Sequence, residues 1–202
     1  MGISPGGRTR FFDAGCGDGL VCSAVFSPDP DRTWRYQLRR VWDPLSPLVA
    51  FVGLNPSTAD ETHDDPTVRR CIGFAKRWGC GGLIMANAFA FRATDPRDMM
   101  AAADPVGPDN DLHLRSVAAE APLVVAAWGA RGVFHGRSGQ LAVLLGELWA
   151  LALTKGGEPR HPLYVRGDAQ RVAWSGRGAN ASRPAGRRAG TLVSPTSTGH
   201  LG

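Results

Sequence analysis

Residues 47–70 read PLVAFVGLNPSTADETHDDPTVRR, and this stretch decides the fold. It opens with an unbroken apolar run that ends at Leu54, which is typical of a strand covered on both faces in a parallel sheet. Asp65 and Pro66 then have the residue types of a helix N-cap and of the first helical position. A buried strand, a polar loop and a helix in succession indicate one unit of an open α/β sheet.

The helix expected after Asp65 carries apolar residues at helical spacing and ends at Gly79. Outward from this unit, strands and helices alternate along the chain. We expect strands in GLIMANAFAF (82–91), PLVVAAWG (122–129) and WALALT (149–154), and helices in NDLHLRSVAAEA (110–121) and GQLAVLLGEL (139–148). The sequence therefore predicts an α/β protein, a three-layer α/β/α domain around a central, mainly parallel sheet.

An antiparallel hairpin is expected before the parallel part. VCSAVF (21–26) is followed by a turn-rich segment and then by TWRYQLRRVW (33–42), in which Trp34, Tyr36 and Leu38 alternate with polar residues. This alternation is typical of a strand pair with one buried face.

The two ends of the chain differ from this pattern. Residues 1–20 are rich in glycine and predict a flexible leader, whereas residues 175–202 have the composition of a disordered basic tail. A single domain is expected between them, over residues 21–174. The net charge of +5 favours polyanion partners such as nucleic acid, although arginine-rich tails also occur without such a partner.

Composition excludes several classes of protein. No apolar run is long enough to cross a bilayer, and the N-terminus lacks a signal-peptide pattern, so we expect a cytoplasmic protein with no membrane partner. The four cysteines form no C-x-x-C pair and no cluster with histidine, so reduced thiols are expected, with no metal and no other cofactor.

Unusual residues stand where the predicted strands end. Ligands of open parallel sheets bind beyond the carboxyl ends of the strands, so these residues are candidates for one pocket. They are Asn55, Pro56 and Ser57 after the first strand, Asn87 and Phe89 in the second, Trp128 and Gly129 after the third, and His161, Pro162, Leu163 and Tyr164 beyond the fourth. Structural uses remain open for the same residues. Asn55 can bond backbone in a turn, Phe89 can pack in the core, and the buried amide of Asn87 can find its partners within the protein.

The loop DETHDD (60–65) raises a second possibility. His63, Asp64 and Asp65 have side chains that bind hard metals or move protons, which would suit a metal-assisted hydrolase. Acids just before a helix are also the expected complement to its positive end.

Several of these motifs carry a family resemblance. GLNPSTADETHDDPTVRRCIGFAKRWGCGGLIMANAFAFRATDPRD, with AAWGARG and TKGGEPRHPLY, resembles a bacterial and phage family, domain of unknown function 1643, over about residues 22–174. The same ordered elements are more distantly similar to the uracil-DNA glycosylase superfamily. Gly53, Leu54, Asn55 and Pro56 are closest to the G-I-N-P motif of its mismatch-specific branch.

The glycosylase resemblance implies roles for individual residues. Asn55 would orient the attacking water, and His161, in an H-P pair with Pro162, would stabilise the leaving base. Asn87 would read a base edge and Phe89 would stack on the base, beside Gly53, Leu54, Pro56 and Ser57. This chain departs from the family pattern because its first motif lacks an Asp and its last motif reads H-P-L-Y.

We therefore expect a glycosylase-like protein that acts on, or reads, a nucleobase in nucleic acid or in a smaller ligand. Arg160 and Arg166 would contact phosphate at the mouth of the pocket. A non-catalytic nucleic-acid or nucleotide binder and the metal-assisted hydrolase are the alternatives.

Overall fold

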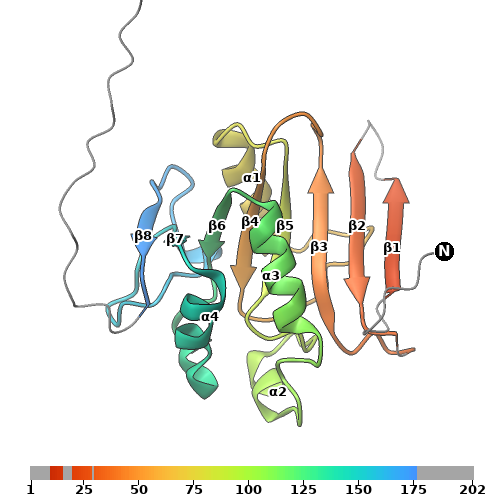
Figure 1. The fold of residues 1–202 in the computed structure, drawn as a ribbon, viewed down its shortest axis with the longest axis vertical. Helices are drawn as coiled ribbons and strands as arrows, with labels where there is room; N and C mark the ends of the chain where they lie inside the picture. Colours follow the sequence, from red (N-terminus) through yellow and green to blue (C-terminus); the bar gives the residue numbers. More distant parts are fainter. Residues whose placement is uncertain (1–9, 16–19, 29, 177–202) are drawn as a thin grey trace, which may run out of the picture.

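The structure is a computed structural model that describes residues 10–15, 20–28 and 30–176 (Figure 1). Its strands are β1 (Arg10–Gly15), β2 (Val21–Phe26), β3 (Arg35–Val41), β4 (Leu48–Gly53), β5 (Gly82–Asn87), β6 (Leu123–Ala126), β7 (Leu148–Ala150) and β8 (Val172–Trp174). Its α-helices are α1 (Pro66–Arg77), α2 (Pro96–Ala101), α3 (Asn110–Glu120) and α4 (Arg137–Leu145), with 3-10 helices η1 (Ala130–Gly136) and η2 (Pro162–Tyr164).

All eight strands form one mixed sheet in the order β1-β2-β3-β5-β4-β6-β7-β8. The four central strands, β5, β4, β6 and β7, are parallel, as the alternation of strands and helices predicts. Antiparallel strands extend the sheet on both sides, and the arrows of β3 and β4 point in opposite directions in Figure 1. The prediction of an α/β protein is confirmed, and the antiparallel share of the sheet is larger than expected.

Helix α1 forms for the reasons its sequence gives. The Asp65 carboxylate accepts a hydrogen bond from the Val68 backbone N–H at 2.8 Å, and Pro66 occupies the first turn. Gly79 follows the helix with a φ of 71°, a left-handed conformation that favours glycine.

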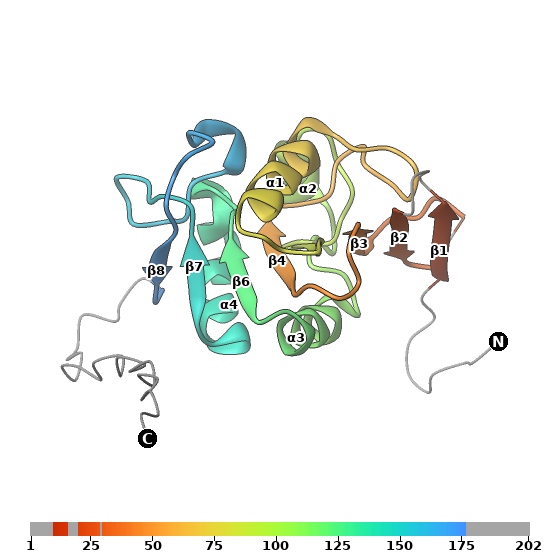
Figure 2. The same ribbon diagram turned by 90° about the horizontal axis from the view of Figure 1, so that it is seen from above.

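Two hydrophobic cores cover opposite faces of the sheet. Phe51 and Met85 pack with Phe74 of α1 in one core, whereas Val52 and Ile84 pack in the other core with side chains of α2, α3 and α4. Figure 2 shows α1 on one side of the sheet and α3 and α4 on the other. Successive residues of β4 and β5 thus point to different cores, which explains why both strands are apolar without interruption.

The N-terminal region contains more structure than the sequence predicts. Arg10–Gly15, assigned to a flexible leader, forms β1 and pairs with β2, so the predicted hairpin is the inner part of a three-stranded meander. The short strand β8 is also unforeseen. Cys71 and Cys80 are free thiols as expected, but Cys22 is disulfide-bonded. The remainder of the leader and residues 177–202 lie outside the described residues.

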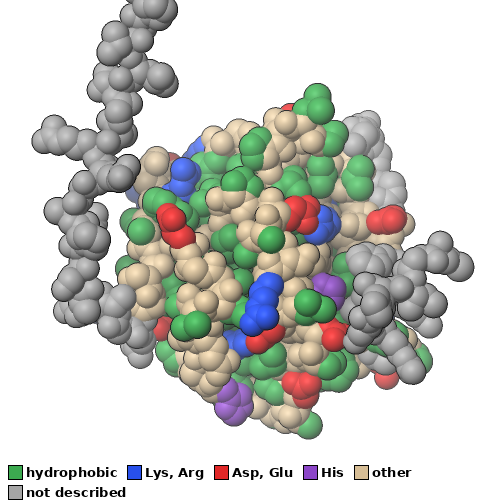
Figure 3. Space-filling model, viewed as in Figure 1, with side chains coloured by type: hydrophobic (Ala, Val, Ile, Leu, Met, Phe, Trp, Pro, Cys, Tyr) green, Lys and Arg blue, Asp and Glu red, His purple; other side chains and the backbone are tan. Residues whose placement is uncertain are grey.

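No described helix has the length and apolar character needed to span a bilayer. On the face seen in Figure 3, acidic and basic side chains are interspersed, and no continuous patch of one sign covers it. Charge on this face therefore gives no indication of a polyanion surface.

Candidate functional site at the strand ends

A cavity of about 770 Å³ lies beyond the carboxyl ends of the parallel strands. The chain leaves the adjacent strands β4 and β6 toward helices on opposite faces of the sheet, which is where open α/β sheets form a crevice. The cavity is lined by Arg35, Gly53, Leu54, Asn55, Ser57, Asp65, Thr67, Val68, Met85, Asn87, Ala93, Thr94, Pro96, Trp128, Gly129, Ala130, Arg131, Thr154, Arg160, His161 and Tyr164.

Asn55 ties together the loops that follow β4 and β5. Its Nδ2 donates to the backbone oxygens of Pro56 at 3.1 Å and Ala93 at 2.8 Å. Both amide protons are thereby used, while Oδ1 has no hydrogen-bond partner among the described residues. The side chain is held in place and still offers one acceptor on the cavity wall.

Asn87 ends β5 and contributes a buried amide to the same cavity. The residue is 3% exposed, and its Nδ2 has no hydrogen-bond partner among the described residues. Gly53 makes room for it, because a Cβ at position 53 would lie 2.9 Å from Asn87 Oδ1. A buried polar atom without a partner carries a desolvation cost of about 1–3 kcal/mol, which a ligand can offset.

A buried polar network holds the backbone behind Asn87. Asn110 Nδ2 donates to the carbonyl oxygens of Asn87 and Ala88, and Arg137 Nε donates to that of Ala88 at 2.7 Å. Arg137 also pairs with Asp111 at 2.5 Å. Asn110 is the first residue of α3 and is fully buried, with Asp109 at the N-cap position. Asn110 lies next to the end of β5, so its side chain reaches the backbone of that strand end.

Trp128 forms a rigid wall of the cavity. The residue is 1% exposed, and its Nε1 donates to Glu158 Oε2 at 3.1 Å. The Trp174 ring packs against it edge to face at 5.1 Å. A Cβ at Gly132 would lie 2.0 Å from Trp128 Cδ1, so this position accepts only glycine. The indole is therefore fixed from several sides before any ligand binds.

His161 stands at the start of η2, where its Nδ1 accepts a hydrogen bond from the Leu163 backbone N–H at 3.4 Å. The Tyr164 ring lies against the imidazole with 5.8 Å between ring centroids. Burial lowers the pKa of His161 below its ordinary value, and the charge of Asp65 opposes that shift. The imidazole is therefore neutral at pH 7, with Nδ1 as the acceptor and Nε2 as the donor.

The structure brings together most of the residues that the strand-end pattern singles out. Those on the cavity wall are Gly53, Leu54, Asn55, Ser57, Asn87, Trp128, Gly129, Arg160, His161 and Tyr164. The cavity lining does not include Pro56, Phe89, Pro162, Leu163 or Arg166.

Phe89 and Arg166 lie off the cavity wall. Phe89 is fully buried and packs with Phe134 at 5.7 Å, because β5 ends at Asn87 and the chain then turns toward the core beneath α3 and α4. Arg166 pairs with Asp168 at 3.1 Å on the surface. Tyr164, by contrast, is 74% exposed and lines the cavity.

Three charged residues of the cavity wall, Asp65, Arg35 and Arg131, were not expected there. Asp65 is the only carboxylate among the lining residues, which also include three arginines. One of these is Arg35, the first residue of β3, which is 2% exposed. The antiparallel pairing of β3 with β5 brings the start of β3 to the edge where β5 ends. The sequence carries that signal only when the strand directions are known.

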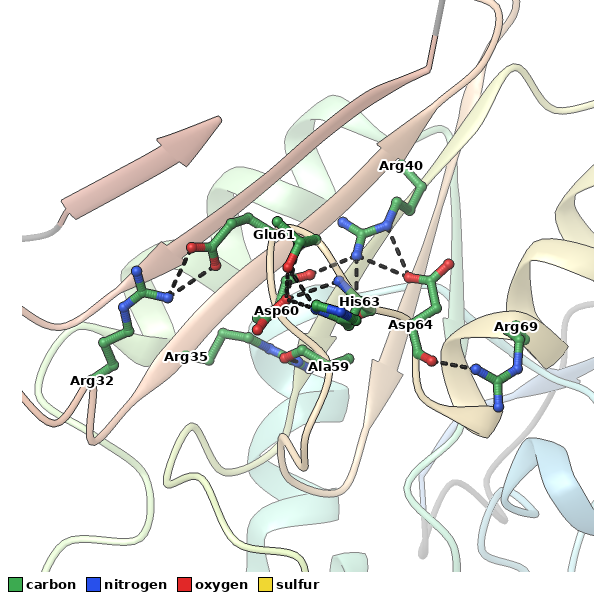
Figure 4. Close-up of polar contacts among 10 residues, drawn as sticks. Arg32, Arg35, Arg40, Ala59, Asp60, Glu61, His63, Asp64 and Arg69 are labelled. Carbon is green, nitrogen blue, oxygen red and sulfur yellow. Dashed lines mark hydrogen bonds and ion pairs between the residues drawn. The ribbon is translucent and has the colours of Figure 1, made fainter. Parts of the chain in front are cut away.

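The acidic loop that follows β4 is engaged by arginines (Figure 4). Arg40 pairs with Asp64 at 2.9 Å, and Arg32 pairs with Glu61 at 3.0 Å. Asp60 accepts from the backbone N–H groups of Thr62 and His63. Among the described residues no group of three or more His, Cys, Asp or Glu side chains is arranged to hold a metal ion. The geometry therefore gives the metal-assisted hydrolase no support.

The fold and the cavity define an α/β protein with a ligand-sized hollow at the switch point of its parallel strands. The chain belongs to the family described as "Protein of unknown function (DUF1643)", whose model matches residues 35–163. The matched range begins at Arg35 and ends one residue before Tyr164, so it contains every other residue of the cavity lining. No curated protein and no solved structure matches the chain.

Proposed function

We propose that this protein is a glycosylase-like hydrolase that takes a nucleobase into the strand-end cavity and cleaves its N-glycosidic bond. The observation that carries the proposal is the Asn87 amide, which is buried on the cavity wall and whose Nδ2 has no hydrogen-bond partner in the described part of the chain. A carboxamide presents a donor and an acceptor side by side, which matches the edge of a base. The resemblance of the strand-end motifs to uracil-DNA glycosylases supports this use of Asn87 as a base reader. We further propose that the domain is a three-layer α/β/α relative of those enzymes.

The hydrolytic step needs a positioned water. In the proposed reaction the C1′–N bond breaks with its electron pair left on the base, and a water oxygen bonds to C1′. Asn55 Oδ1 accepts a hydrogen bond from that water. As the water oxygen bonds to C1′, a proton of the water passes to the Asp65 carboxylate on the same wall. Asp65 thus supplies the carboxylate that the G-L-N-P motif lacks.

The leaving base departs with negative charge. A neutral His161 donates from Nε2 to a developing oxyanion on the base, which lowers the barrier without requiring a proton transfer. The exposed ring of Tyr164 stacks on the base or on its neighbour at the mouth of the cavity. The exposed side chains of Arg131 and Arg160 contact the phosphates there.

One observation favours a second function, a binding module without turnover. Both Nδ2 protons of Asn55 are committed to backbone carbonyls, which is also what a purely structural Asn would do. Such a module would keep the base-reading amide of Asn87 and would bind nucleic acid with a strong dependence on salt.

Base release separates the two functions. Oligonucleotides that contain uracil, a mismatched thymine or a modified base are incubated with the protein, and the free base is measured. We expect release from at least one substrate, and a rate loss of about 10²–10³ in Asn55→Ala with its melting temperature monitored in parallel. Arg166→Ala, which alters a paired arginine off the cavity wall, is the control and keeps the original rate. Salt-dependent binding with no base released, by the parent protein or by Asn55→Ala, would replace catalysis with the binding module.

A further inference from the structure

A β-bulge turns Arg35 into the cavity. Val25 pairs with Gln37 and Phe26 pairs with Arg35, so Tyr36 is an extra residue in β3. The extra residue shifts the alternation, and the Arg35 side chain reaches the loop carbonyl of Ala59 on the α1 side of the sheet (Figure 4). Bulges of this kind re-aim single side chains and are frequent beside binding sites.

The charge of Arg35 is buried, and it forms no ion pair with any residue that the structure describes. Its Nη1 donates to Ala59 O at 2.5 Å, and its Nε has no hydrogen-bond partner among the described residues. No carboxylate of the described residues lies within ion-pair distance of the guanidinium. Within the described part of the chain, a carbonyl oxygen is thus the only acceptor for this 2% exposed cation.

The groups around Arg35 do not cancel its charge. Burial lowers its pKa to about 10, with Asp65 and Asp60 raising the pKa and Arg92 and Arg40 lowering it. The guanidinium therefore stays protonated at neutral pH. Arg35 is removed from water, and the two cations and two carboxylates around it offset one another. Its desolvation therefore costs free energy that an anionic or acceptor-rich ligand can offset.

Burial also separates the arginines of the cavity by depth. Arg35 and Asn87 are 2% and 3% exposed, whereas Arg131 and Arg160 are exposed. Phosphates of a nucleic acid remain in water and suit the exposed pair. The buried pair therefore faces the part of the ligand that enters the cavity, which under the proposed function is the base.

We propose that Arg35 binds the acidic edge of the base, so that the cavity selects an oxo-substituted, imide-type heterocycle and holds it as its anion. This proposal rests on the part of the proposed function that places a base in the cavity, and it names the chemical class of that base. Arginine donates and cannot accept, so it favours the carbonyl oxygens and a deprotonated ring nitrogen of the base over the amino groups of adenine or cytosine. The base expelled by glycosidic cleavage is also an anion, so the same arginine would stabilise it.

Binding of free bases tests the proposal without any turnover. The probes are uracil, 5-fluorouracil, whose ring N–H is more acidic, and cytosine, each titrated calorimetrically from pH 6 to pH 9. We expect 5-fluorouracil to bind more tightly as it ionises, to exceed uracil at high pH, and to exceed cytosine throughout. Arg35→Gln should lower the affinity for ionised 5-fluorouracil by about tenfold or more, and Arg35→Lys should restore part of it.

The control is Arg40→Gln, which removes an arginine of the same strand that bonds the same loop but does not line the cavity. It should leave the ratio of 5-fluorouracil to uracil affinity unchanged. The proposal is overturned if the parent protein binds none of the bases, if 5-fluorouracil affinity does not rise with pH, or if Arg40→Gln and Arg35→Gln change the ratio alike. Anion-selective binding without base release would end the glycosylase proposal and leave this one standing.

Discussion

Two arginines of β3 reach the same loop and meet opposite surroundings. Arg40 is 1% exposed and donates to the Asp64 carboxylate and to the backbone oxygens of Asp60 and Arg39. Arg35 is buried to a similar extent, yet the one acceptor of its side chain among the described residues is the backbone oxygen of Ala59. All three guanidinium nitrogens of Arg40 donate to acceptors in the chain, whereas Arg35 Nε has no partner among the described residues.

The difference shows how to separate scaffold from binding wall in this molecule. In the acidic loop Glu61 and Asp64 each pair with an arginine of the chain, so these two carboxylates need no ligand. Among the described residues, Arg35 Nε and Asn87 Nδ2 of the cavity wall have no hydrogen-bond partner. The hydrogen bonds of the Asn55 side chain in this part of the chain use only its Nδ2 and leave Oδ1 open. Buried polar groups in folded proteins are nearly always hydrogen-bonded, so under our proposals Arg35 Nε and Asn87 Nδ2 are the buried atoms of the cavity wall that a ligand would satisfy.

Removing Arg40 should detach the acidic loop from β3 and have the largest effect on stability. Arg40→Ala deletes a buried ion pair and further bonds to the loop, and we expect a loss of about 3 kcal/mol in the free energy of unfolding. Chemical denaturation measures the change. The matched control is Arg39→Ala, whose pair with Glu120 is partly exposed and should contribute under about 1 kcal/mol. Equal losses in the two variants would remove the distinction.

Gly53→Ala should damage the cavity wall directly. The added Cβ would lie 2.9 Å from Asn87 Oδ1, so the amide must move, at a cost of about 1–2 kcal/mol in stability and with weaker base binding. The control is Gly73→Ala on α1, where an added Cβ meets nothing within 4 Å and a gain of about 0.5–1 kcal/mol is expected. Unchanged base affinity in Gly53→Ala would show that the position of Asn87 is unimportant.

Acid should loosen the scaffold loop by a smaller amount. Burial raises the pKa of Asp60, but hydrogen bonds from Thr62 and His63 outweigh burial and lower the pKa to about 2. Because the unfolded value is about 3.9, the contribution is present above that pH and is lost as the pH falls toward 2. The side chain is 31% exposed, so we expect under about 1 kcal/mol.

The measurement is the urea midpoint between pH 5 and pH 2, compared with Asp60→Asn, which keeps an acceptor oxygen and cannot titrate there. The parent protein should lose stability more steeply than the variant across this window. Parallel profiles would show that Asp60 carries no pH-dependent contribution.

Local signals in the sequence predict the parallel part of the fold well. The Asp65 cap, the proline after it and Gly79 act within one or two turns, and they delimit α1 as expected. The strand ends Asn55 and Asn87 follow from the apolar runs that precede them, and both line the cavity. These features depend on neighbours in the chain, which a sequence displays.

Features that depend on distant pairing escaped prediction. Arg35 reaches the cavity only because β3 runs against β5 and carries an extra residue at Tyr36. Phe89 packs in the core and does not line the cavity. β5 ends at Asn87, so the alternation of side chains along a strand no longer applies two residues later. The antiparallel edges β1 and β8 are short strands whose existence depends on the partner they meet.

The meander at the N-terminal side of the sheet has a practical consequence for anyone who shortens this chain. β3 covers the side of β5 away from β4, and every residue of β5 is buried. A fragment that starts at β4 would expose that apolar strand with its backbone hydrogen-bonding groups bare, which is the usual template for intermolecular β-pairing. Such a fragment should aggregate, and it would also lack Arg35, so assays of recombinant protein are sound only with the meander retained.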